Sequence, residues 1–99
     1  MSWSGGLASA NKTWQIEIAR TAEKQIRKLD RVAQESIIRF LRERLQAVEN
    51  PRQLGKALRG DKKDLWRYRV GDYRLICDIQ DEQAVVLVLR VGHRKDVYR

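Results

Sequence analysis

Residues 65–79 read LWRYRVGDYRLICDI, in which two runs of alternating polar and apolar side chains flank the pair Gly71-Asp72. Alternation with a period of two is typical of a strand with one buried face. A glycine-containing pair between two such runs favours a tight hairpin turn. A two-residue turn places Arg69 opposite Arg74 and Val70 opposite Tyr73. This stretch therefore predicts an antiparallel hairpin, around which the rest of a sheet can form.

The predicted hairpin separates charged from apolar side chains. Opposed residues share a face and every second residue joins them, so Arg67, Arg69 and Arg74 are predicted to project from one side. The other side then carries the apolar set, which is Trp66, Tyr68, Val70, Tyr73, Leu75, Cys77 and Ile79. A shift of one residue in the register would mix the two sets and bury an arginine.

Outside the hairpin, the apolar periodicity predicts further elements. TWQIEIA at 13–19 alternates as a half-buried strand, and AVVLVLRV at 84–91 is a further strand-like run. Apolar residues at helical spacing predict two helices from about Thr21, separated at Asp30 by an N-cap and ended at Asn50-Pro51. RQLGKALRGDKKD at 52–64 is polar and basic and is expected to form a loop.

These elements predict an α+β fold in the order β-α-α-β-β-β, with a small, mostly antiparallel sheet packed against two N-terminal helices. The 99 residues are expected to hold a single domain at 13–99 after a flexible leader at 1–12. One His and one Cys leave no metal cluster or internal disulfide, and no apolar run approaches the ~20 residues of a membrane span. We therefore expect a soluble, cytoplasmic protein without a metal or another cofactor.

Charge is the strongest bulk feature of the chain. Lys and Arg number 21 against 13 Asp and Glu, a net charge of +8. Such a surface attracts polyanions such as nucleic acid. In the alternative interpretation, the hairpin arginines extend into water or pair with carboxylates such as Asp78. The use of Arg rather than Lys on the hairpin favours planar, bidentate contacts with phosphate.

The stretch VGHRKDVYR at 91–99 directly follows the last predicted strand. His93 is the only histidine, and imidazole titrates near neutral pH, which suits acid–base chemistry. With Gly92 as a swivel, a short coil is expected to carry His93, Arg94 and Tyr98 over the hairpin arginines. Tyr98 could then stack on an RNA base or accept a proton.

LWRYRVGDYRLICDI at 65–79, followed by VLVLRVGHRKDVY at 86–98, resembles the RelE/ParE toxin superfamily of bacterial toxin–antitoxin modules. The resemblance spans roughly residues 13–99 and includes LRG at 58–60. It implies a toxin of the RelE type, a small basic ribonuclease that enters the ribosomal A site and cuts messenger RNA. The family's site positions correspond to Arg67, Arg69, Arg74, Arg94 and Tyr98.

RelE-type members often carry lysines where this chain has Arg67 and Arg69, and one such lysine is a candidate proton acceptor. Arginine cannot accept a proton because it stays charged, so these two residues are interpreted as an electrostatic clamp on the scissile phosphate. The implied reaction is metal-independent and uses the 2′-OH of the RNA as the nucleophile. The residues expected to bind RNA or the ribosome are Lys56, Arg59, Lys62 and Lys63.

The resemblance also implies the partners of the protein. These are an acidic RelB-like antitoxin, the ribosome with its 16S rRNA and A-site mRNA, and operator DNA reached only through the antitoxin. ParE-type relatives share the fold but target DNA gyrase and generally lack the basic constellation. A non-enzymatic gyrase inhibitor, a ribosome or RNA binder without cleavage, and an inactive module remain alternatives.

Overall fold

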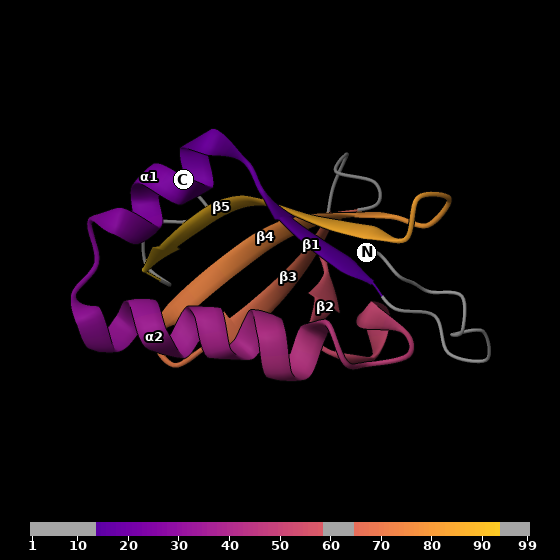
Figure 1. Cartoon of the computed structure of the whole chain (residues 1–99), viewed down its shortest axis with the longest axis horizontal. Helices are drawn as coiled ribbons and strands as arrows, with labels where there is room; N and C mark the ends of the chain where they lie inside the picture. The colour runs from indigo at the N-terminus through magenta and orange to yellow at the C-terminus, as the bar shows by residue number, and fades with distance from the viewer. Residues whose placement is uncertain (1–13, 59–64, 94–99) are drawn as a thin grey trace, which may run out of the picture.

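The computed structural model describes residues 14–58 and 65–93, which form two helices against one sheet. In chain order the elements are β1 (Gln15–Ile18), α1 (Arg20–Arg27), α2 (Arg31–Arg39), the π-helix η2 (Phe40–Leu45), the 3-10 helix η3 (Pro51–Gln53), β2 (Lys56–Ala57), β3 (Leu65–Val70), β4 (Tyr73–Gln80) and β5 (Val85–His93). The five strands lie in the order β1-β5-β4-β3-β2. The β1–β5 pair is parallel and the other pairs are antiparallel. Figure 1 shows α1 and α2 on one face of this sheet, which confirms the predicted α+β fold.

The β3–β4 hairpin has the register that the sequence predicts. Val70 pairs with Tyr73 and Arg69 pairs with Arg74, so that Gly71 and Asp72 form the turn. Gly71 takes a φ of 60°, a positive value that glycine adopts without strain. Because β4 also pairs with β5, the hairpin lies inside the sheet and determines which face each neighbouring residue joins.

The apolar face of the hairpin forms the sheet side of the core. Tyr68, Leu75, Cys77 and Ile79 are buried, whereas Trp66, Val70 and Tyr73 are partly buried and pack against them. The helical segments supply the facing layer, with buried Ala22, Ile26, Ile37, Leu41 and Leu45. All seven hairpin residues predicted to be apolar-facing therefore belong to the core, which leaves the opposite face of the sheet for charged side chains.

Asp30 separates the two helices, as predicted. Its Oδ1 accepts a hydrogen bond of 2.8 Å from the backbone N–H of Ala33, which satisfies one of the free amides of the first turn of α2. Gln34 reinforces the same junction from α2, because its Nε2 donates to the carbonyl oxygens of Ile26 and Leu29. The two helices are thus joined tightly enough to cover one side of the sheet together.

The prediction that the second helix runs to Asn50-Pro51 is wrong. α2 ends at Arg39 and continues as the π-helix η2, in which the N–H of Gln46 donates to the carbonyl of Leu41 at 2.9 Å. A π-turn holds one more residue than an α-turn, and apolar spacing alone does not distinguish the two. Asn50 instead caps η3, because its Oδ1 accepts from the N–H of Arg52.

The predicted loop at 52–64 begins with regular structure. β2 pairs Lys56 with Arg67 and so adds an edge strand of two residues, which is too short to show an alternating pattern. Gly55 permits the chain before β2 to lie this close to β3. Its φ is +79°, and an added Cβ would lie 2.2 Å from the carbonyl oxygen of Arg67. The indole Nε1 of Trp66 donates to the carbonyl of Leu54 at 2.7 Å and holds the segment in place.

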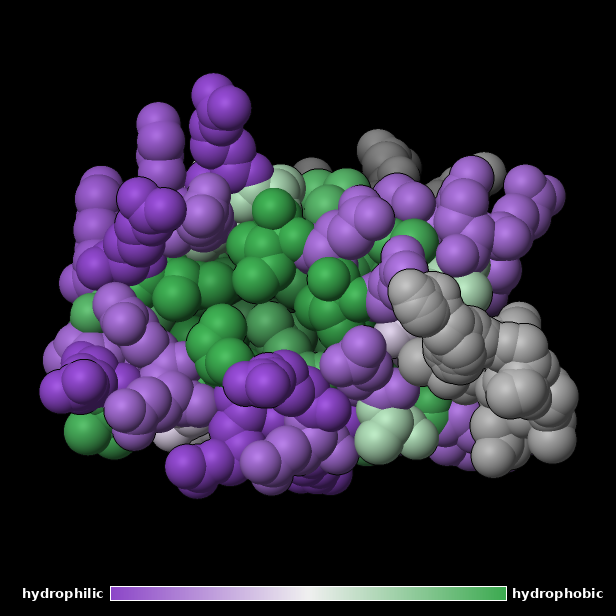
Figure 2. Space-filling view, in the orientation of Figure 1, coloured by the Kyte–Doolittle hydropathy of each residue, from purple (hydrophilic) through white to green (hydrophobic). Residues whose placement is uncertain are grey.

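Figure 2 shows apolar side chains at the centre of the helix-bearing face, between α1 and α2. Val32 of α2 is 73% exposed and Ile18 of β1 is 37% exposed. Within the ranges 14–58 and 65–93, no helix is long and apolar enough to cross a membrane. The predicted leader at 1–12 lies outside the described residues.

We expect Gly55→Ala to destabilise the protein far more than Gly71→Ala. Both positions have a positive φ, which costs an alanine about 1–2 kcal/mol. At Gly55 the new Cβ also meets the Arg67 carbonyl, whereas at Gly71 it meets none of the described atoms within 4 Å. Urea denaturation should show losses in the free energy of unfolding of about 1–2 kcal/mol for Gly71→Ala and of at least about 3 kcal/mol for Gly55→Ala. Equal losses would contradict the close approach of Gly55 to β3.

Candidate functional site

Arginines gather on the face of the sheet opposite to the helices. Arg69 pairs with Arg74, and Arg67 pairs with Ile76. Paired residues project from the same face of a sheet, so Arg67, Arg69 and Arg74 share one face, as the sequence predicts. We call this surface the arginine face.

The sequence pattern did not predict a fourth member of the arginine face, Arg90 of β5. Arg90 pairs with Ile76 because the β4–β5 register shifts between Ile76 and Cys77. Without this shift, Leu89 would pair with Ile76 and Arg90 would point into the core. A charged residue at a core position of an otherwise regular strand is itself the signal for such a bulge.

The positive charges of Arg69 and Arg74 are poorly neutralised by the described part of the chain. Arg74 donates to two backbone carbonyls, those of Gly71 at 3.4 Å and Tyr73 at 3.2 Å. Among residues 14–58 and 65–93, no carboxylate forms an ion pair with Arg69 or Arg74. Asp78, the carboxylate expected as an alternative partner, accepts a hydrogen bond from Gln80 at 3.2 Å. Opposed like charges destabilise a strand pair by a few tenths to ~1 kcal/mol, which a bound anion would relieve.

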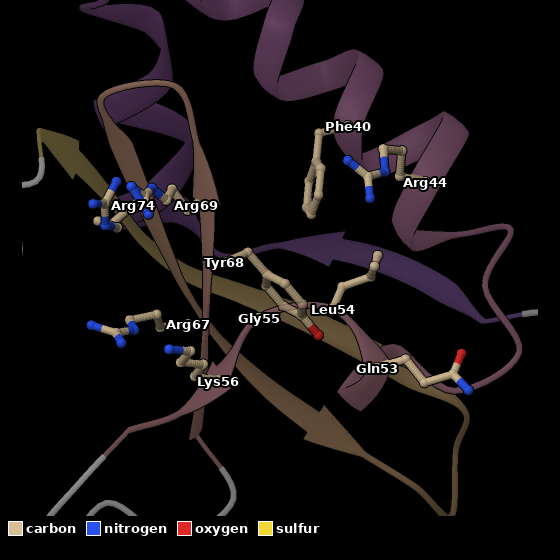
Figure 3. Close-up of a pocket in the computed structure, with 10 residues that line it drawn as sticks. All are labelled: Phe40, Arg44, Gln53, Leu54, Gly55, Lys56, Arg67, Tyr68, Arg69 and Arg74. Carbon is tan, nitrogen blue, oxygen red and sulfur yellow. The ribbon is translucent and has the colours of Figure 1, made fainter.

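A hollow of about 560 Å³ lies at the open edge of β3, next to the arginine face (Figure 3). β2 pairs only with Trp66 and Arg67, so the rest of this edge is left without a strand partner among the described residues. Cationic side chains from four elements line the hollow, namely Arg44, Lys56, Arg67, Arg69 and Arg74. Phe40 of η2 lines it from the helix side. The hollow and the arginine face together form one continuous cationic site.

Tyr68 lies at the base of this hollow and has a structural role. Its side chain is buried, and its hydroxyl donates a hydrogen bond of 2.8 Å to the carbonyl of Pro51. Burial raises the pKa of the Tyr68 phenol well above its usual value near 10, and Cys77 adds to the increase. Burial likewise raises the pKa of the Cys77 thiol. Both groups stay protonated at neutral pH, so neither is suited to accept a proton from a substrate.

The predicted placement of His93 is wrong. β5 continues through His93, and Gly92 pairs with Arg74 as an ordinary strand residue instead of starting a coil. His93 pairs with Tyr73, and their rings meet edge to face with centroids 5.9 Å apart. Tyr73 packs against the core, so His93 joins the helix-bearing side of the sheet. The structure therefore does not bring the imidazole onto the arginine face.

The other predicted site residues divide into two groups. Lys56 lines the hollow together with the hairpin arginines. Outside the described residues lie Arg59, Lys62, Lys63, Arg94 and Tyr98. Within the described ranges, no group of three or more His, Cys, Asp or Glu side chains gathers that could hold a metal ion. The charged groups that line the hollow are Lys and Arg side chains, which are suited to bind anions.

A small sheet with two helices on one face is also the architecture of a solved bacterial toxin. The chain matches the structure of the toxin–antitoxin complex RelBE2 from Mycobacterium tuberculosis with a TM-score of 0.75 and 31% identity. The match covers 85% of this chain and 94% of the matched chain. The fold is therefore that of the RelE toxins.

The sequence comparisons agree with the structural one. The family model for the ParE toxin of the type II toxin-antitoxin system, parDE, matches residues 16–98. Toxin RelG of Mycobacterium tuberculosis is 33% identical over 84 residues, which are 85% of this chain and 94% of that toxin. Toxin RelE of the same organism is 30% identical over 91 residues, 92% of each protein. The chain belongs to the RelE/ParE superfamily and is a toxin of a type II toxin–antitoxin system.

Tyr68→Phe should lower the free energy of unfolding at neutral pH and should make that free energy fall less steeply as the pH rises into the alkaline range. The loss of the hydrogen bond to Pro51 should cost about 1 kcal/mol. Because burial raises the pKa of the folded phenol, its contribution is complete below pH ~10 and is lost as the pH rises above that value. At pH ~11 the loss of stability that comes from Tyr68 alone is about 1.4 kcal/mol in the wild-type protein, and this contribution is absent in the variant.

Urea denaturation of both proteins at several pH values between about 8 and 11 measures this difference. Cys77 is present in both and contributes the same alkaline loss to each, so the comparison isolates Tyr68. An identical fall in stability for the two proteins would contradict a phenol that is buried and protonated.

Proposed function

We propose that this toxin is an endoribonuclease that cleaves mRNA in the ribosomal A site and thereby inhibits translation. The observation that carries the proposal is the arginine face, in which Arg69 and Arg74 are directly opposed without an ion-pair partner among the described residues. Guanidinium groups bind phosphate oxygens in planar, bidentate geometry. The similarity to toxins RelE and RelG supports the same assignment.

In the proposed reaction the RNA supplies its own nucleophile. The 2′-oxygen attacks the adjacent phosphorus, the bond from phosphorus to the 5′-oxygen breaks, and a 2′,3′-cyclic phosphate and a free 5′-hydroxyl result. The 2′-hydroxyl loses one proton and the leaving oxygen gains one. Arg67, Arg69 and Arg74 stabilise the negative charge that develops on the non-bridging oxygens, and no metal is required for this task. Arg90 extends the same cationic surface across β5.

The remaining roles in the reaction are assigned to residues that follow β5 in the sequence. Arg94 and Tyr98 correspond to site positions of RelE-type toxins. We assign leaving-group stabilisation to Arg94, and base stacking or proton acceptance to Tyr98. Their position in the sequence is favourable because β5 passes beside Arg74 before it ends. His93 is a weaker choice, since its ring lies with Tyr73 on the other side of the sheet.

We further propose an acidic RelB-like antitoxin as the partner. The net charge of +8 favours an acidic chain that folds on binding. The apolar centre of the helix-bearing face offers a surface that such a chain would cover (Figure 2), and Val32 and Ile18 are further exposed apolar side chains. The ribosome would be the second partner, in the cytoplasm, and operator DNA would be reached through the antitoxin.

A ParE-type inhibitor of DNA gyrase is the second candidate function. The observation in its favour is the family model that matches residues 16–98, which describes the ParE toxin. Such a toxin would act by binding and would not cleave RNA. A supercoiling assay with purified gyrase separates the two functions, since an mRNA-cleaving toxin should leave supercoiling unchanged.

We expect the purified toxin to cut ribosome-bound messages efficiently and naked RNA weakly. The described residues of the site supply cations but few proton-transfer groups, so the ribosome would have to align the 2′-OH for in-line attack. Message ends mapped in a translating extract, beside the same RNA without ribosomes, measure the difference. Equal cleavage of free and ribosome-bound RNA would contradict ribosome dependence, and intact messages in both would contradict the nuclease.

Arg74→Ala should lower the single-turnover rate of cleavage on programmed ribosomes by roughly 10²–10³, the scale of a lost electrostatic donor. Arg39→Ala on the exposed outer side of α2 removes the same charge and should leave the rate unchanged. His93→Gln should retain the wild-type rate to within a few-fold. Thermal melts of each variant report folding, which should survive because Arg74→Ala relieves repulsion with Arg69. A well-folded Arg74→Ala protein that cleaves at the wild-type rate would contradict the proposal that Arg74 stabilises charge on the phosphate.

A further inference from the structure

We infer that the hollow between η2 and the edge of β3 is a nucleobase subsite, in which Phe40 and Arg44 hold the base attached to the phosphate on the arginine face. The inference rests on the proposed function, because it takes RNA as the ligand. It adds two residues of a helical segment to a site otherwise built from strands. Neither residue is predicted by the hairpin pattern.

The first argument is the pairing of an aromatic ring with a guanidinium group inside the hollow. The Phe40 ring is partly exposed, and the guanidinium carbon of Arg44 lies 5.9 Å from its centroid. Phe40 also contacts Tyr68, with the ring centroids 5.6 Å apart and the ring planes at 52° to each other. Tyr68 is buried and so fixes the orientation of Phe40. Aromatic faces and Arg planes are the surfaces on which unstacked RNA bases bind.

The second argument is the continuity of the hollow with the arginine face. Arg69 and Arg74 line the same hollow as Phe40 and Arg44, and Figure 3 shows the two pairs on either side of β3, near the end of the strand. A phosphate bound by Arg69 and Arg74 where they border the hollow would leave its attached base to enter the hollow toward Phe40 and Arg44. The volume of about 560 Å³ falls within the range of about 300–1,000 Å³ usual for small-ligand sites.

The third argument is the polar group opposite the arginines. Gln53 lines the hollow on the side away from Arg69 and Arg74 (Figure 3). Its side-chain amide offers both donors and an acceptor, which are the groups that recognise a base edge. The hollow thus combines a phosphate-binding side, a stacking surface and a hydrogen-bonding end, a combination that fits a nucleotide better than a simple anion.

The π-helix η2 places Phe40 and Arg44 at the hollow, whereas its other arginine, Arg42, lies elsewhere. Arg42 lies in the same π-helix but lines a different groove, on the outer side of α2, with Gln34 and Glu35. Arg42 and Arg44 thus have the same charge and similar exposure in one short element. Arg42→Ala is therefore the matched control for Arg44→Ala.

Nuclear magnetic resonance titration of the labelled full chain tests the inference without any cleavage. The probes are AMP and ribose 5-phosphate, which share the phosphate and differ in the base. AMP should shift the Phe40 ring and Arg44 side-chain resonances saturably, whereas ribose 5-phosphate should shift the Arg69 and Arg74 side chains alone. Arg44→Ala should weaken AMP binding by about tenfold, as expected for lost stacking. Arg42→Ala should leave it unchanged.

Three results would overturn the inference. They are identical shifts with both probes, an undisturbed Phe40 ring at saturating AMP, and equal weakening of AMP binding by Arg42→Ala and Arg44→Ala. Because binding is measured directly, a toxin that binds AMP here but cuts no message would refute the nuclease and leave the subsite standing.

A second measurement separates a base subsite from a peptide groove. Cleavage on ribosomes programmed with different A-site codons should change its codon preference in Arg44→Ala, whereas Arg74→Ala should slow all codons alike. Phe40→Leu keeps an apolar side chain against Tyr68 and should show the same altered preference as Arg44→Ala. An Arg44→Ala variant that loses antitoxin affinity but keeps the wild-type affinity for AMP would show a peptide groove and contradict the subsite.

Discussion

The register of β3 against β4 is the constraint on which the rest of the molecule depends. A turn of two residues, with Gly71 at a positive φ, places Arg69 opposite Arg74 and leaves the core-forming residues of the hairpin, among them Tyr68, Leu75 and Cys77, on the other face. A shift of one residue would move arginines into the core and expose Tyr68 and Leu75. The helices can cover one side of the sheet only because this register makes that side apolar, and the charged site exists on the other side for the same reason.

The arginine face shows how function and stability compete in a small domain. Arg69 and Arg74 repel each other across one strand pair, and the described carboxylates do not compensate them. The core beneath provides the stability that tolerates this cost, with Tyr68, Leu75, Cys77 and Val88 fully buried. A protein selected for stability alone would place carboxylates or threonines at these strand positions. The opposed pair Arg69 and Arg74 is therefore a destabilising feature, which the anion-binding role proposed above would account for.

Much of the fold could be predicted because it depends on local patterns. The hairpin register, the Asp30 cap and the apolar face all follow from spacing and turn chemistry. The remaining features depend on contacts between distant segments. Arg90 reaches the arginine face through a bulge opposite Ile76, and Phe40 reaches the hollow through a π-turn. The sequence pattern places His93 wrongly because Gly92 can continue a strand as well as end one, and only the pairing of Gly92 with Arg74 shows that the strand continues.

The parallel pairing of β1 with β5 has a consequence for how the chain folds during synthesis. β1 begins at Gln15, and β5, its only partner among the described strands, begins at Val85. This edge of the sheet therefore forms by pairing two strands that lie far apart in the sequence. α1 also packs mainly on β5. The elements synthesised early therefore have no sheet to cover until β5 has emerged, and a partly made chain cannot hold the folded site. A toxin with this topology would in this way stay inert until β5 has been synthesised.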